Sequence, residues 1–250
     1  MLKNRFTSLV LAATVSIATL SPVHAAQREL VIATDTAFIP FEFKQGGSYV
    51  GFDLDLWDAI AKEAGLDYHF QAMDFAGIIP GLQTNNIDAA LAGIAINDVR
   101  KRVIDFSDPY YNSGLTAIVP IDSKINSIEE LNGKRIAAKT GTATVDWIKK
   151  NLKPSELRLF PNIDNAYMEL RAGGVDAAMH DTPNVLYYIK SAGAGKVKTV
   201  GQPTSGDQYG IAFAKGSPLV GPVNAALKAI KADGRYAAIY KKWFDTAPPL

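Results

Sequence analysis

A basic side chain, Arg100, lies at a position that favours negative charge. It belongs to the stretch 89–108 (AALAGIAINDVRKRVIDFSD), in which an apolar run ends at Gly93 and a polar segment begins at Asn97. The pattern predicts the first turn of a helix here, and the N-terminus of a helix favours anions over cations. Either the guanidinium points into water, or it faces an anion from outside the chain. Because a guanidinium can bind a carboxylate through two parallel hydrogen bonds, we expect Arg100 to bind the carboxylate of a small ligand.

Further polar residues stand where apolar segments end, namely Asp35, Lys139, His180 and Asp181. Ligands of parallel sheets bind beyond the carboxyl ends of the strands, so we expect these side chains to line one polar site. Asp35 and Lys139 suit an amide, which needs an acceptor for its NH2 group and a donor for its oxygen. A structural salt bridge is the alternative. A lone histidine is more often structural, and Asp181 could cap the next helix, although Thr182 is the better N-cap candidate.

The segments around these residues alternate between strand and helix patterns. Apolar runs typical of buried strands cover 29–34, 67–73 and 88–94, and helical spacing covers 54–64 and 78–83. Two internal echoes, NIDAALAG beside GVDAAMHD and ELVIATDT beside KRIAAKTG, extend the same order to the second half. The alternation predicts an α/β protein in which each half forms a mostly parallel sheet flanked by helices.

Residues 1–25 have the features of a cleavable signal peptide: a basic start, an apolar run and the small-residue site Val23-His24-Ala25. Their removal takes away Lys3 and Arg5 and no acidic residue, so the net charge changes from +1 to −1. A nearly neutral chain is not expected to bind nucleic acid or an anionic membrane. The sequence has no cysteine and no clustered metal-ligand spacing. We therefore expect an exported periplasmic protein without metal or cofactor.

A series of motifs runs in order along nearly the whole chain after residue 25: ATDTAFIPFEF, GFDLDLW, MDFAGIIPGLQT, DFSDPYY, FPNIDNAYMEL, HDTPN, QYGIAF and YKKWF. In these motifs the sequence resembles the periplasmic glutamine-binding proteins of ABC importers, in the polar amino-acid group of solute-binding protein family 3. The resemblance implies a two-lobed clamp of the type II periplasmic-binding-protein fold. Its large lobe would comprise 28–109 and 210–250, its two hinge crossings 110–114 and 205–209, and its small lobe 115–204.

The resemblance also assigns a role to each candidate site residue. Arg100 would bind the α-carboxylate of an amino acid, and Asp181 with the carbonyl of Gly93 would bind its α-ammonium. The remaining contacts would be Asp35, Lys139 and His180 around the side-chain amide, with Phe38 and Phe75 on the two sides of the aliphatic part. Without the resemblance, the two phenylalanines would be interpreted as core residues.

Two positions depart from the pattern of the family. Ala95 stands where the family usually has a threonine or serine hydroxyl near the α-amino group, and Ala143 stands where a glycine approaches the ligand. Losing one hydrogen bond costs about 0.5–1.5 kcal/mol, which is about tenfold in affinity at most. The missing hydroxyl would therefore weaken binding more than it would change the ligand, and we expect a backbone N–H or a water to replace it.

The resulting hypothesis is a monomeric receptor that captures L-glutamine and delivers it to an inner-membrane ABC permease with a cytoplasmic ATPase. A receptor for another polar amino acid is the nearest alternative. Two more distant alternatives are a sensor module and an enzyme of the prephenate- or arogenate-dehydratase type on the same fold. The sequence contains no G-x-S-x-G, G-x-G-x-x-G or Walker motif. The Arg100 and Asp181 pair also favours a binding protein over an enzyme.

Overall fold

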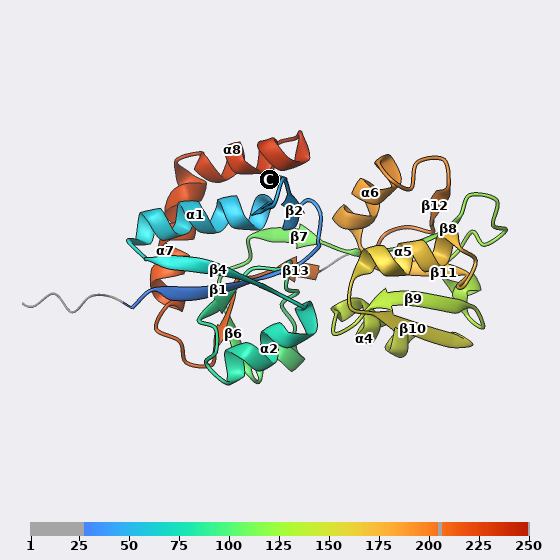
Figure 1. Ribbon diagram of the computed structural model, residues 1–250, viewed down its shortest axis with the longest axis horizontal. Coiled ribbons are helices and arrows are strands. Elements are labelled where there is room, and N and C mark those ends of the chain that lie inside the picture. The colour runs from blue at the N-terminus through green and yellow to red at the C-terminus, as the bar shows by residue number, and fades with distance from the viewer. Residues whose placement is uncertain (1–27, 205–206, 250) are drawn as a thin grey trace, which may run out of the picture.

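The computed structural model of the protein describes residues 28–204 and 207–249, so the predicted signal peptide (1–25) lies outside the described residues. The described residues form two five-stranded sheets that lie side by side, each flanked by helices (Figure 1). We call the part built on the first sheet the first lobe and the part built on the second sheet the second lobe. The expected α/β architecture with two lobes is confirmed.

The first sheet has the strand order β4-β1-β5-β14-β6. β1 pairs in parallel with β4 and β5, whereas β14 is antiparallel to β5 and β6. Only β14 therefore runs against the other strands, and the sheet is mostly parallel, as the sequence predicts. The bounds are β1 (Leu30–Asp35), β4 (Tyr68–Met73), β5 (Ala89–Ala90), β6 (Ile104–Phe106) and β14 (Ala212–Ala214).

The second sheet repeats this plan with the order β10-β9-β11-β8-β12. β9 is parallel to β10 and β11, and β8 is antiparallel to β11 and β12. In both sheets the reversed strand is the one that the chain enters after it crosses from the other lobe. The bounds are β8 (Leu115–Pro120), β9 (Arg135–Lys139), β10 (Glu156–Phe160), β11 (Ala177–Asp181) and β12 (Val197–Val200).

The segments that repeat in the sequence occupy equivalent strands of the two sheets. The paired alanines of the central strands are Ala33 with Ala90 and Ala137 with Ala178. Two residues after Ala33 comes Asp35, and two residues after Ala137 comes Lys139. The repeated pattern therefore places two oppositely charged side chains at equivalent strand ends.

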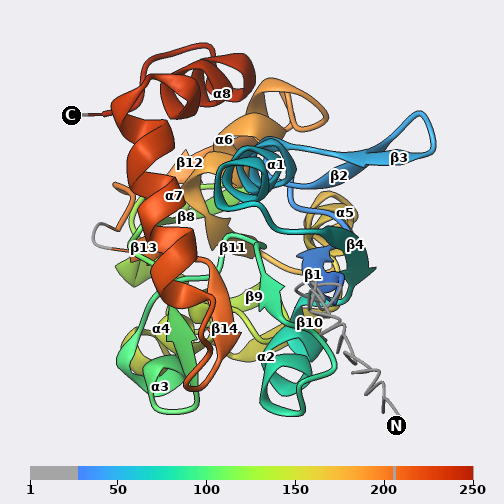
Figure 2. The same ribbon diagram turned by 90° about the vertical axis from the view of Figure 1, so that its left-hand side faces the viewer.

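Helices cover both faces of each sheet. In the first lobe, α1, α7 and α8 pack on one face and α2 on the other (Figures 1 and 2). In the second lobe, α4 packs on one face and α5 and α6 on the other. The bounds are α1 (Phe52–Ala64), α2 (Phe75–Gln83), α3 (Asp98–Lys101), α4 (Ala143–Asn151), α5 (Ile163–Arg171), α6 (Thr182–Lys190), α7 (Val220–Ala232) and α8 (Arg235–Phe244), with a 3-10 turn at Glu129–Leu131 and a hairpin of β2 (Phe43–Gln45) and β3 (Ser48–Val50).

Two short strands, β7 (Tyr111–Ser113) and β13 (Asp207–Tyr209), pair in antiparallel fashion between the two sheets (Figure 1). The chain leaves the first lobe through β7 and returns to it through β13. The lobe and crossing boundaries given above from the sequence stay a prediction, and residues 205–206 of the second crossing lie outside the described residues. No helix within 28–204 and 207–249 has the length and apolar character needed to cross a membrane.

Two local expectations were wrong, and a third holds only in part. The strand predicted over 88–94 is confined to Ala89–Ala90, and Gly93 then turns the chain with a φ of 53°. A helical turn does begin at Asp98 with Asn97 as its N-cap, as expected, but it ends at Lys101, so it is too short to have a dipole that Arg100 would oppose. Asp181, not Thr182, occupies the N-cap position of α6, although its side chain makes no capping hydrogen bond.

Candidate ligand-binding site

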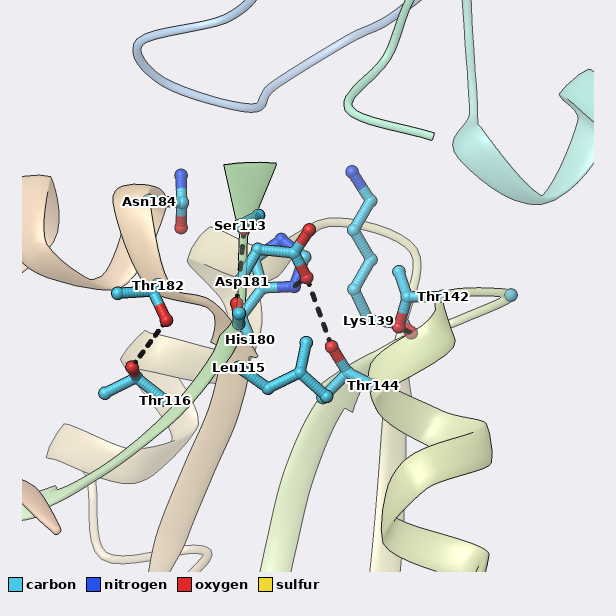
Figure 3. Close-up of polar contacts among 12 residues, drawn as sticks. Ser113, Leu115, Thr116, Lys139, Thr142, Thr144, His180, Asp181, Thr182 and Asn184 are labelled. Atoms are coloured by element: carbon cyan, nitrogen blue, oxygen red, sulfur yellow. Dashed lines mark hydrogen bonds and ion pairs between the residues drawn. The ribbon is translucent and has the colours of Figure 1, made fainter. Parts of the chain in front are cut away.

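A small cavity lies between the lobes, where β1, β9 and β11 end. Figure 3 shows its second-lobe side, with loops of the first lobe facing it. The predicted site residues that line it are Asp35, Phe38, Phe75, Gly93, Lys139, His180 and Asp181, joined by Ala92 and Thr142. The other predicted residues, Ala95, Arg100 and Ala143, are not part of the lining. The structure thus brings most of the expected side chains to one place.

Asp35 and Lys139 form a buried ion pair that joins the two lobes across this cavity. Each is the last residue of its strand, and each is 1% exposed. Burial raises the pKa of Asp35, while the Lys139 ammonium opposes that rise. The backbone N–H of Thr36 donates to Asp35 Oδ1 at 2.8 Å. A carboxylate acceptor and an ammonium donor therefore face the same point in the cavity.

Arg100 is a buried cation, 6% exposed, and not a solvated surface charge. Its Nη1 donates to the carbonyl of Ala95 at 2.8 Å in the first lobe, and its Nη2 donates to the carbonyl of Gly141 at 3.1 Å in the second. Burial lowers the pKa of Arg100, and the negative charge of Asp181 opposes this shift. The two bonds use two of its five N–H donors. Arg100 thus bridges the lobes while retaining donors of the kind that a carboxylate accepts.

Asp181 ends β11, and its carboxylate accepts two hydrogen bonds. Tyr209 of the crossing strand β13 donates to Oδ2. Thr144 of α4 donates to Oδ1 at 3.3 Å (Figure 3). Burial raises the pKa of Asp181 to about 6, against the effects of Tyr209, Thr144 and Arg100. The carboxyl group is therefore ionised at neutral pH and can pair with an ammonium.

His180 is a buried, neutral imidazole. Burial lowers its pKa well below the usual range, and the charge of Lys139 lowers it further. Within the described residues neither ring nitrogen has a hydrogen-bond partner. Its Nδ1 lies 3.5 Å from Asp181 Oδ1, but a neutral ring forms no ion pair there. One nitrogen can therefore donate and the other accept, which suits an amide.

Phe38 and Phe75 form the apolar walls of the cavity. The Phe75 ring centroid lies 5.6 Å from Arg100 Cζ and 5.7 Å from Lys139 Nζ. The Phe38 ring contacts Gly93 so closely that a Cβ added there would lie 2.3 Å from Phe38 Cε1. Because Gly93 also has a φ of 53°, which side chains rarely adopt, only glycine fits at this point of the cavity.

Residues 30–246 match the family model of bacterial extracellular solute-binding proteins, family 3. The chain belongs to this family. The match covers both lobes and both crossing strands, and it confirms the resemblance seen in the motifs. As a family 3 protein, the chain is an amino-acid solute-binding protein of an ABC transporter.

Proteins similar to this family 3 chain are named for different ligands. The ABC transporter glutamine-binding protein GlnH of Bacillus subtilis (strain 168) is 34% identical over 222 residues, 87% of this chain and 81% of that protein. The arginine-, lysine-, histidine-binding protein ArtJ of Geobacillus stearothermophilus is 36% identical, with a TM-score of 0.86 over 89% of this chain and 98% of ArtJ. An ancestral arginine-binding protein bound to glutamine is 42% identical, with a TM-score of 0.81 over 87% and 98%. These structures confirm the type II fold.

The structure accommodates both residues that differ from the usual family pattern, Ala95 and Ala143. Ala95 is buried, its carbonyl holds Arg100, and its backbone forms a bridge with Tyr209. Ala143 is the first residue of α4, and its φ is not positive. Alanine therefore fits at 143 without strain, and the backbone N–H remains at the start of the helix.

Sequence reasoning missed three residues that support the site. Thr142 lines the cavity, and its hydroxyl donates to the carbonyl of Lys139 at 2.8 Å. Thr144 and Tyr209 hold the carboxylate of Asp181. The place of Thr142 just before a helical pattern is a usable signal, whereas nothing local in the sequence links Tyr209 to Asp181. Over the described ranges, no group of three or more acidic or histidine side chains is placed to hold a metal.

Proposed function

We propose that this protein is a monomeric periplasmic receptor that captures L-glutamine between its lobes and delivers it to an inner-membrane permease with a cytoplasmic ATPase. The buried Asp35–Lys139 pair carries the choice of ligand. A carboxamide can accept from the ammonium and donate to the carboxylate. The neutral imidazole of His180 lines the same cavity and adds no charge. The membrane partners follow from the ABC-importer family.

The amino-acid backbone would be bound by Arg100 on one side and by Asp181 with the Gly93 carbonyl on the other. No side chain caps α4 at Thr142, and Arg100 already donates to Gly141, the residue before it. A cation beside the N–H groups of a helix N-terminus suits a carboxylate. Asp181, which is ionised at neutral pH, suits the ammonium. These contacts support the assignment of both ends of the ligand.

Charge favours glutamine over the ligands named for ArtJ. The side chain of an arginine or lysine ligand would bring a second cation to Lys139, and that of glutamate would bring a second carboxylate to Asp35. Like charges at a buried site are strongly unfavourable, which makes them effective against the wrong ligand. A neutral amide introduces no such repulsion.

An enzyme of the dehydratase type would need a general acid poised against a leaving hydroxyl. His180 is not an imidazolium at neutral pH, because its pKa lies well below the usual range, and a neutral imidazole is too weak an acid for this role. Asp181 is ionised at that pH as well. Neither of these two side chains therefore supplies the general acid, which favours a binding protein. A sensor role would use the same site, and a pull-down of membrane partners would distinguish it from transport.

The test is a thermal-shift and calorimetry panel of the common amino acids on the exported protein at pH 7.5. Glutamine should raise Tm in a concentration-dependent way, corresponding to about 2.7 kcal/mol of stabilisation at a hundredfold excess over Kd. Recovery of unchanged glutamine after incubation would separate binding from catalysis. Strong binding of arginine together with no response to glutamine would overturn the proposal.

A further inference from the structure

Two carboxyl groups lie behind the cavity and are fully buried. Glu42 precedes β2, Asp53 lies in the first turn of α1, and both are 0% exposed. Their side chains are within hydrogen-bonding reach of each other. Neither residue lines the cavity, so the binding contacts described above do not use them. Two adjacent buried carboxyl groups cannot both be ionised without a large cost, which implies a proton between them.

The hydrogen bonds place the negative charge on Asp53. Its Oδ2 accepts from the backbone N–H of Gly93 at 3.1 Å and from the hydroxyl of Tyr110 at 2.8 Å. Its position in the first turn of α1 adds the favourable end of the helix dipole. By contrast, Glu42 Oε1, Glu42 Oε2 and Asp53 Oδ1 meet no N–H or O–H donor in residues 28–204 and 207–249. A proton carried by Glu42 and donated to Asp53 Oδ1 supplies the missing partner.

The charges around the pair agree with this placement. Burial raises the pKa of Glu42 well above its usual range, Asp53 and Asp35 raise it further, and Lys139 opposes them. Burial raises the pKa of Asp53 only to about 6, because Gly93, Tyr110 and Glu42 stabilise its ionised form by hydrogen bonds. At neutral pH the pair therefore carries a single negative charge, on Asp53.

We propose that Glu42 and Asp53 share one proton and act as positioning residues that fix the backbone of Gly93, and with it the carbonyl that faces the ligand ammonium. Gly93 is held by the Phe38 ring on its Cα side and by Asp53 through its N–H. The same Asp53 oxygen binds Tyr110, whose carbonyl accepts from Tyr236 of α8 at 2.5 Å. The pair thus ties a wall of the site to the start of the first crossing. Only the role toward the ammonium rests on the proposed function.

The first test looks for the proton in the protein without ligand. An infrared spectrum at pH 8 should contain the C=O stretching band of a protonated carboxylic acid. Glu42→Gln should remove this band, because its neutral amide replaces the proton donor with similar shape. The control Glu29→Gln changes an exposed glutamate and should retain the band. A wild-type spectrum without the band, or a band that survives Glu42→Gln, overturns the shared proton.

The second test follows the backbone amide of Gly93 in 1H–15N spectra. Asp53→Asn should move the Gly93 amide proton upfield, because the charged acceptor is lost, and should weaken glutamine binding on the order of tenfold. The exposed control Asp67→Asn should do neither. Glu42→Gln, which can still donate to Asp53, should leave the Gly93 resonance near its wild-type position, whereas a role in packing alone would move it in both variants.

The outcomes separate this inference from the proposed function. An unmoved Gly93 resonance in Asp53→Asn overturns the positioning role. A moved resonance with unchanged glutamine affinity overturns the link to the ligand. If Asp53→Asn does not fold, the infrared comparison with Glu42→Gln still decides whether the proton is there. If wild-type protein binds no glutamine, the proposed function fails. The infrared and NMR results still decide whether Glu42 and Asp53 share a proton and whether Asp53 fixes Gly93.

Discussion

At the scale of single residues, the site balances buried charges. Arg100 and Lys139 supply two cations, Asp35 and Asp181 supply two carboxylates, and His180 is neutral. Each of these charges would be costly to bury alone. A zwitterion with a neutral side chain leaves their sum at zero, whereas arginine or glutamate does not. The charge balance is therefore a property of the residues that constrains the class of ligand.

Replacing Arg100 should cost most of the affinity. Arg100→Ala removes the buried guanidinium that we propose binds the ligand carboxylate, and the loss of one partner from such a pair costs on the order of 2–5 kcal/mol in binding. Arg102→Ala, at an exposed position two residues away, is the matched control and should leave Kd unchanged. Calorimetry measures both. Equal Kd values for Arg100→Ala and the wild type would remove Arg100 from the site.

The affinity for glutamine should fall in acid because of Asp181. Its pKa is about 6 in the protein without ligand, so above pH 7 it is ionised and, in the function proposed above, pairs with the ammonium of the ligand. Below pH 6 its proton must first be lost, and the affinity should fall by about tenfold for each further pH unit. Asp181→Asn should bind weakly at every pH and show a shallower fall, limited to the effect of protonating Asp53, whose pKa is also about 6. Titrations from pH 5 to pH 8 test this, and an identical slope in Asp181→Asn would contradict it.

At the scale of elements, the sequence pattern predicts the kind and order of the strands better than it predicts where each strand ends. The echo of alanine-rich strands correctly predicted equivalent ends for β1 and β9, because small apolar residues suit strands that are covered on both faces. The end of β5 was missed, because the bend at Gly93 depends on contacts with Phe38 and Asp53 from distant parts of the chain. The same limit explains Tyr209: its partner Asp181 is 28 residues away and on another element.

The turn between β9 and α4 should control how closely the lobes approach. Gly141 has a φ of 77°, and a Cβ there would lie 3.3 Å from Ala76 of α2 in the first lobe. Gly133 has a φ of 74° with no atom within 4 Å of such a Cβ. Gly141→Ala and Gly133→Ala should therefore lose similar folding stability, about 1–2 kcal/mol each, but only Gly141→Ala should weaken glutamine binding. Thermal melts and calorimetry compare the two, and equal affinities would count against the contact.

At the scale of the whole molecule, the two lobes meet through polar contacts around the cavity as well as inside it. Arg100 donates to Gly141, and Asn184 of α6 donates through Nδ2 to the carbonyl of Ile39 in the first lobe at 2.8 Å. Tyr167 donates to Asn184 Oδ1 at 2.8 Å and fixes this side chain within the second lobe. Contacts between the lobes contribute to ligand affinity, because they change the fraction of molecules in the binding-competent arrangement.

Asn184 isolates this contribution, because it joins the lobes without lining the cavity. Asn184→Ala removes one hydrogen bond between the lobes, worth about 0.5–1.5 kcal/mol, and should weaken glutamine binding by up to about tenfold. X-ray scattering should show a larger radius of gyration for the variant without ligand and a wild-type value at saturating glutamine. The control is Asn162→Ala, which removes a hydrogen bond to Asp164 within the second lobe and should change neither quantity. A larger radius that persists at saturation would mean that Asn184 supports the fold of its own lobe, and the coupling between closure and binding would then not pass through it.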